Sequence, residues 1–112
     1  MREDRTARMR ELNDGLRRTG AGGFIVVTSG VDALAPDDKQ AVFALVRSFD
    51  AFTPDNDPWR EHDFGSVEHD GQRYFWKITY YQAGSDYSQG AEDPSDASTT
   101  ARVMTIMMAE EY

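Results

Sequence analysis

Residues 64–81 read FGSVEHDGQRYFWKITYY, and they carry the clearest structural signal in this chain. Asp70-Gly71 is a dipeptide typical of a tight hairpin turn, and the residues that follow it are aromatic or β-branched at most positions. The stretch therefore predicts two antiparallel strands, at residues 64–69 and 72–81. We interpret its aromatic side chains as core rather than as a surface for stacking bases.

The register of this hairpin has two possible values. A two-residue turn places Gly65 opposite Trp76, whereas a three-residue turn places Phe64 opposite Trp76. A shift of one residue exchanges the face that is buried. We favour the two-residue turn, because it gathers Tyr74, Trp76 and Ile78 on one face and lets the indole cover a glycine.

Two helices and one strand are predicted before the hairpin. Apolar residues recur at helical spacing within residues 4–18, which indicates an amphipathic helix in the basic N-terminal segment, residues 1–20. Residues 24–28, FIVVT, are a β-branched run after glycines and suit a short buried strand. A second helix is predicted from Pro36 to Phe49, because proline is tolerated in a first turn and apolar side chains follow on one face.

A long loop and a third helix are predicted after the hairpin. Residues 82–97 are rich in Gly, Ser, Asp and Pro and are typical of a long surface loop. Residues 98–112 are expected to form a helix with an apolar stripe. That stripe consists of Val103, Met104, Ile106, Met107 and Met108. The order α-β-α-β-β-α predicts one α+β domain over residues 1–112, with a three-stranded, mostly antiparallel sheet packed with helices.

The composition narrows the class of protein. The chain has 112 residues, with 12 Lys and Arg against 20 Asp and Glu, a net charge of −8 and no cysteine. This length suits one domain, and without cysteine there is no disulfide and no thiolate zinc site. No apolar run approaches the roughly 20 residues of a membrane span, and the N-terminus lacks the apolar core of a signal peptide, so we expect a cytoplasmic protein. The negative charge argues against direct binding of nucleic acid.

The charges are unevenly distributed. Residues 1–20 carry six arginines and four acidic residues, whereas residues 50–70 carry seven acidic residues and one base, Arg60. The seven are Asp50, Asp55, Asp57, Glu61, Asp63, Glu68 and Asp70. We expect this acidic part to be the functional face. The basic N-terminal segment either folds back on it, or on a second copy, or remains a solvated helix.

A loop with two prolines, FTPDNDPW at residues 52–59, lies inside the acidic part. A stiff loop loses less entropy when a partner binds. The predicted partner-binding residues are Asp55, Asn56, Asp57, Trp59, Glu61 and Asp63. Alternatively, Asp55 and Asn56 bond to the main chain of a turn. Trp59 is expected outside the core, unlike Trp76.

The same segment also permits an interpretation as a metal site. Carboxylates and imidazole together can bind Mn²⁺ or Mg²⁺. The candidate ligands are Asp57, Glu61, His62 and Asp63, with Asp55 and His69 nearby. They match no established ligand motif. The chain also lacks a nucleophile elbow, a phosphate-binding loop and a cysteine nucleophile, so we predict no catalytic residue and no cofactor.

Four phrases from residue 52 onward resemble a known family. They are FTPDNDPWREHDFG, YFWKITYY, a Gly/Ser/Asp-rich loop with Asp93-Pro94, and RVMTIMMAEEY. Together they resemble a small uncharacterised bacterial family known only as a domain of unknown function, and the similarity extends from LNDGLRRTG to Tyr112. Proteins of this kind are often encoded on plasmids and other mobile elements. The resemblance implies a compact domain in such a setting and no particular activity.

These observations favour a binding or inhibitor protein that presents an acidic surface to a basic partner. A nucleic-acid-processing defence complex, of the restriction or CRISPR kind, is the expected target, because spaced carboxylates mimic phosphates and steer encounter. Two other classes remain: a small metal-dependent enzyme or ion-binding domain built on residues 55–63, and a structural homodimer that uses the methionine-rich segment.

Overall fold

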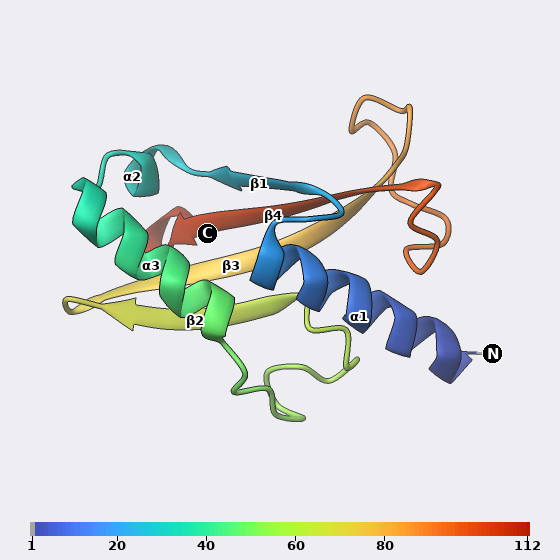
Figure 1. The fold of residues 1–112 in the computed structure, drawn as a ribbon, viewed down its shortest axis with the longest axis horizontal. Helices are drawn as coiled ribbons and strands as arrows, with labels where there is room; N and C mark the ends of the chain where they lie inside the picture. The colour runs from blue at the N-terminus through green and yellow to red at the C-terminus, as the bar shows by residue number, and fades with distance from the viewer. Residues whose placement is uncertain (1) are drawn as a thin grey trace.

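A four-stranded mixed sheet forms the centre of the fold (Figure 1). The computed structural model describes the backbone of residues 2–112 and the side chains of residues 4–112. The strands are β1 (Phe24–Val27), β2 (Phe64–His69), β3 (Gln72–Gln82) and β4 (Thr100–Met108), in the spatial order β1-β4-β3-β2. The β1–β4 pair is parallel, and the other two pairs are antiparallel. The α+β class is confirmed, but the sheet has four strands rather than three.

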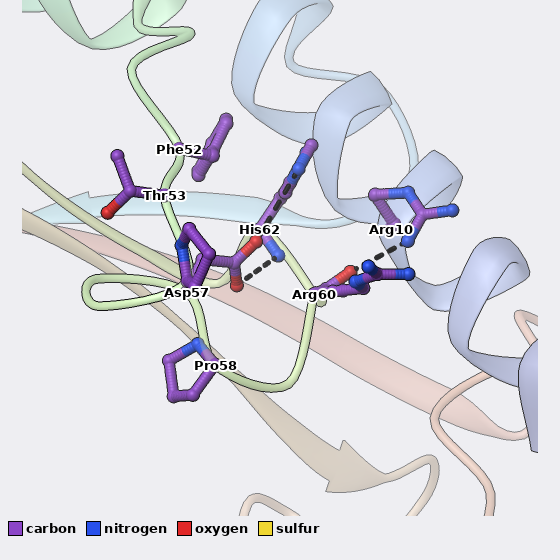
Figure 2. A pocket seen from close by; sticks show the side chains of 8 residues that line it. Arg10, Phe52, Thr53, Asp57, Pro58, Arg60 and His62 are labelled. Carbon is purple, nitrogen blue, oxygen red and sulfur yellow. Dashed lines mark hydrogen bonds and ion pairs between the residues drawn. The ribbon is translucent and has the colours of Figure 1, made fainter.

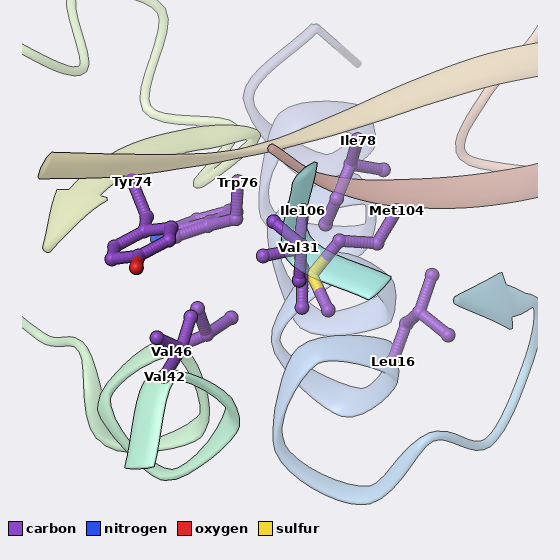
Figure 3. Close-up of a cluster of buried hydrophobic side chains, with 9 residues drawn as sticks. All are labelled: Leu16, Val31, Val42, Val46, Tyr74, Trp76, Ile78, Met104 and Ile106. Atoms are coloured by element: carbon purple, nitrogen blue, oxygen red, sulfur yellow. The ribbon is translucent and has the colours of Figure 1, made fainter. Parts of the chain in front are cut away.

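The two longer helices cover one face of this sheet. They are α1 (Arg2–Thr19) and α3 (Pro36–Ser48), close to the predicted bounds, and a short α2 (Ser29–Asp32) and a 3₁₀ turn η1 (Ala109–Glu111) complete the order. Buried side chains fill the space between helices and sheet (Figure 3). They are Leu16, Val31, Val42, Val46, Tyr74, Trp76, Ile78, Met104 and Ile106. Most of the remaining chain, including the predicted loop at 82–97, lacks extended regular structure.

The hairpin has the predicted two-residue register. Gly65 lies opposite Trp76, and Val67 lies opposite Tyr74. Trp76 is fully buried, whereas Trp59 is 77% exposed, so both expectations for the tryptophans are confirmed. A Cβ atom placed at Gly65 would overlap the indole ring, which explains why only glycine fits there.

The helix predicted at residues 98–112 is wrong, because most of that segment forms β4. Its side chains alternate, and Thr100, Arg102, Met104 and Ile106 are all buried on the helix-covered side. The run MTIMM is apolar at most positions, so it fits a helical and a strand period equally well. Pairing decides between them: every residue from Thr100 to Met108 lies opposite a residue of β3.

Strand β1 was expected to be buried, and this expectation is also wrong. Phe24, Ile25 and Val26 are 57%, 43% and 45% exposed. The reason is the position of β1 in the sheet. It is an edge strand, and within residues 2–112 it pairs only with β4. An apolar run between glycines indicates a strand, but it does not tell a central strand from an edge strand.

Candidate functional site

The candidate site is the segment at residues 52–63, called the Trp59 loop below, which joins α3 to β2 beside α1 (Figure 1). Together with α1 it borders an open pocket of about 600 Å³ (Figure 2). The pocket is lined by Arg10, Phe52, Thr53, Pro54, Asp57, Pro58, Arg60 and His62. Of the predicted acidic residues, Asp57 alone lines this pocket, together with two arginines and a histidine.

His62 is the centre of the site. Its ring stacks on the Phe52 ring, with the centroids 3.6 Å apart and the planes 3° from parallel. Its Nδ1 lies 2.9 Å from Asp14 Oδ1 on α1, and its Nε2 lies 3.5 Å from Asp57 Oδ2 in the loop. Each ring nitrogen therefore faces a carboxylate from a different part of the chain, and the imidazole links α1 to the loop.

The loop has no regular secondary structure, but hydrogen bonds between side chains and the main chain hold it in place. The His62 N–H donates to Asp57 Oδ1 at 3.1 Å, and an Arg10 N–H donates to the Arg60 carbonyl at 3.0 Å. Asn56 Oδ1 accepts the Thr53 N–H at 2.8 Å, so Asn56 makes the turn bond that was the alternative to partner contact. Arg60 and His62 have φ of 60° and 56°, a left-handed conformation that is uncommon for residues other than glycine. Such positions persist only where the surroundings hold them.

A polar network fixes the end of the loop to the sheet. The Tyr80 hydroxyl donates to Glu61 Oε1 at 2.9 Å, and Asn13 Nδ2 donates to the Tyr80 oxygen at 2.7 Å. Asn13 Nδ2 also lies 2.9 Å from the Glu61 carbonyl, and Asn13 Oδ1 accepts the Arg102 Nε–H at 2.7 Å. Arg102 reaches the Pro94 carbonyl in turn. One buried asparagine therefore joins α1, the Trp59 loop, β3 and β4.

Burial changes the acidity of three groups here. Burial raises the pKa of Glu61, although the Tyr80 hydrogen bond opposes this, and burial likewise raises the pKa of Asp63. In both cases neighbouring carboxylates add to the increase. Burial also raises the pKa of Tyr80 far above its ordinary value, so the phenol remains a hydrogen-bond donor to Glu61.

The six predicted partner-binding residues divide into two groups. Asp55, Asn56 and Trp59 are exposed on the loop. Asp57 is only 7% exposed, and Glu61 and Asp63 are half-buried. The first three face solvent, whereas the carboxylates of Asp57 and Glu61 are already engaged by the protein's own donors.

The structure does not assemble the predicted metal ligands. Asp57 and His62 are adjacent, but Glu61 bonds to Tyr80, and no group of three or more His, Asp or Glu side chains in the described part of the chain could hold a metal ion. His69 lies elsewhere, with Nε2 2.9 Å from Asp38 Oδ1 on α3.

Sequence reasoning missed Asn13, Asp14, Tyr80 and Arg102. They come from α1, β3 and β4, so spacing along the chain does not connect them. One signal was available: Asn13 and Arg17 lie one helical turn apart beside Leu16, on the apolar side of a helix where polar residues are unusual.

Comparisons with known proteins place the chain in a family without assigning it an activity. No curated protein and no solved structure matches it. Within residues 2–112, no helix is both long and apolar enough to cross a membrane. One family model matches residues 27–111, which include the Trp59 loop and strands β2 to β4. The chain therefore belongs to the family described as protein of unknown function DUF3768.

Proposed function

We propose that this chain is a protein-binding module and that the Trp59 loop is its contact surface. The observation that carries the proposal is the 77% exposure of Trp59 on a loop whose backbone is held by hydrogen bonds. Moving an exposed tryptophan side chain from water into an interface releases a large favourable free energy, and tryptophan is enriched among the residues that dominate binding at protein interfaces. A loop that is already ordered gives up little entropy when a partner docks.

The charge of the protein favours a basic partner. The chain carries −8, and Asp50, Asp55, Glu68 and Asp70 are exposed in the acidic part. Exposed carboxylates steer a basic partner and can occupy a groove built for phosphates. The finer proposal is therefore inhibition of a nucleic-acid-processing defence complex by charge mimicry. Its support is this charge, together with the mobile-element setting that the sequence resemblance implies.

Burial argues against direct contact between a partner and two of the predicted partner-binding carboxylates, Asp57 and Glu61. Asp57 and Glu61 hold the loop in place, so we assign partner contact to Asp55 and Trp59 and support of the loop to the other two. Neutralising Asp55 should slow association, whereas neutralising Asp57 should first disturb the loop itself.

The test uses the intact protein as bait in extracts of its native host, followed by affinity measurements with the retained protein. Trp59→Ala should weaken binding at least about tenfold and leave the melting temperature unchanged, because the indole is 77% exposed and its loss removes little packing. Tyr87→Ala is the matched control, since Tyr87 is also about half exposed, at 51%, but lies in another loop. Unchanged affinity for Trp59→Ala would refute the proposal.

Two further measurements test the finer proposal. Affinity should fall steeply as salt rises, because exposed charges are screened beyond about 8–10 Å. A nucleic acid that the partner binds should compete with this protein. If the affinity does not respond to salt and duplex DNA or RNA does not compete, charge mimicry is wrong even if Trp59 is the anchor.

A further inference from the structure

The outer edge of β1 is an unused pairing site. The Thr28 N–H donates to the Ile106 carbonyl at 3.1 Å, which fixes the alternation of the strand. The main-chain groups of Phe24 and Val26 therefore point toward β4, and those of Ile25 and Val27 point to the opposite side. No strand of residues 2–112 pairs there. The edge thus offers N–H donors and C=O acceptors to another strand.

The side chains of β1 do not protect this edge. Edge strands are commonly guarded by charges, prolines or bulges, and FIVV has none of these. On the open face of the sheet, Phe24 and Val26 border a groove of about 430 Å³. On the helix-covered face, Ile25 and Val27 border a second groove of about 470 Å³. An added strand would therefore bury apolar surface on both faces as well as pair with the main chain.

The charges around the outer edge of β1 favour a second copy of this chain as the strand that pairs there. Residues 15–31 contain no acidic residue and two arginines, and residues 99–109 contain one arginine and no acidic residue. In a chain of net charge −8, a second copy meets the least repulsion here. Two carboxylates near the end of β1 already have partners. Glu111 accepts hydrogen bonds from Thr28 Oγ1 and the Gly30 N–H, and Asp32, which borders the same groove as Ile25 and Val27, lies 3.3 Å from Lys39 Nζ. The other outer strand, β2, contains Glu68 and adjoins Asp70, so it suits self-pairing poorly.

We propose that β1 pairs with β1 of a second copy, antiparallel about a two-fold axis through Val26. In this register Ile25 of one copy lies opposite Val27 of the other, and the two symmetry-related pairs each exchange both main-chain hydrogen bonds. Val26 faces Val26 across the axis in a non-hydrogen-bonded pair, where side chains are closest. The strand is thus complementary to itself, and two four-stranded sheets join into one.

The first experiment is sedimentation velocity of the intact protein over a concentration series. The short strand predicts a dimer that dissociates on dilution. Val26→Lys should remain monomeric throughout, because it places two ammonium groups against each other on the axis. Leu45→Lys is the matched control, since Leu45 is another exposed apolar residue, at 36%, but lies on α3, and it should dimerise as the parent does.

The second experiment uses the absence of cysteine from the chain. Val26→Cys should form a dimer linked by a disulfide under mild oxidation, because each cysteine faces its own copy. Ile25→Cys should link far less, because it faces Val27. A parent protein that stays monomeric at every concentration refutes the pairing and would point to a strand of a different protein. Dimerisation that survives Val26→Lys, or linkage that is equal for both cysteine variants, also refutes it.

Discussion

Replacing Arg17 should cost the protein more stability than replacing any other charged residue on α1. The Arg17 side chain is fully buried, and its guanidinium donates to the carbonyls of Val46, Arg47 and Phe49 at 3.2, 3.2 and 2.8 Å. These carbonyls lie at the C-terminal end of α3 and just after it, where a helix leaves its last carbonyls without intrahelical donors, although the Val46 carbonyl also accepts the Phe49 N–H at 3.3 Å. The guanidinium also lies 2.9 Å from Asp14 Oδ1 and over the Trp76 ring, 5.1 Å from its centroid.

The expected loss for Arg17→Met is about 3–5 kcal/mol. Methionine keeps most of the aliphatic packing but removes the guanidinium donor from the Arg47 and Phe49 carbonyls and the cation from Asp14, which then keeps His62 as its partner. A buried acceptor without a partner costs about 1–3 kcal/mol, and breaking a buried ion pair from one side costs about 3–5 kcal/mol. For a domain of this size, 1 kcal/mol corresponds to about 3–6 °C, so the melting temperature should fall by at least about 10 °C.

Thermal and urea unfolding followed by circular dichroism would measure this loss. Arg18→Met is the matched control, because Arg18 is the exposed neighbour and should change stability by no more than about 0.5 kcal/mol. Arg17→Lys should fall between them, since an ammonium retains the charge but not the planar fork of donors. If Arg17→Met costs less than about 1 kcal/mol, the guanidinium does not cap α3 in the way described.

Three more changes test other parts of the fold. Gly65→Ala should lower stability by about 1–3 kcal/mol, because the new methyl group overlaps the Trp76 indole, and an unchanged urea midpoint would contradict this. Asp57→Ala should cost about 1–3 kcal/mol, because its buried carboxylate accepts a main-chain N–H. Asp55→Ala on the same loop is the control and should be nearly neutral, because Asp55 is exposed. Equal melting temperatures for the two variants would be inconsistent with the loop geometry. Asp63→Asn should gain stability relative to the parent as pH rises from about 4 to about 7. The sign follows from the raised pKa of Asp63. The folded parent binds this proton more tightly than the unfolded parent, so the parent loses stability as rising pH removes the proton, whereas the asparagine variant has no proton to lose. A difference between parent and variant that is constant across pH would show that this pKa is not raised.

The hairpin could be predicted because its information is local. A turn dipeptide, a glycine and an aromatic strand lie within 18 residues, and only one register lets Trp76 cover Gly65. The last strand could not be predicted in the same way. Its apolar run satisfies both periods, and only the nine-residue ladder with β3, from a distant part of the chain, selects the extended form.

In the candidate site, too, features set by neighbouring residues could be predicted and features set by distant residues could not. The exposed Trp59 and the turn chemistry of Asn56 follow from a short segment, and both expectations can be checked there. The burial of Asp57 could not be inferred, because its neighbour His62, with Nε2 3.5 Å from Asp57 Oδ2, is bound in turn to Asp14 on α1, a distant part of the chain. A count of acidic residues does not tell which of them face water.

The position of β1 has a consequence for how the chain folds during synthesis. The strand emerges early, but its partner β4 lies at residues 100–108, and the Asn13–Arg102 contact likewise spans 89 positions. Helix α1 can pack against α3 and the Trp59 loop earlier, but β1 must wait until residues 100–108 have been made before it can pair, with Phe24 to Val27 exposed in the meantime. Contacts of such long sequence separation slow folding and extend the time during which an apolar segment can associate wrongly. A ribosome-bound chain that ends before Thr100 should therefore keep β1 accessible to proteases and chaperones, and release of the last dozen residues should abruptly protect it.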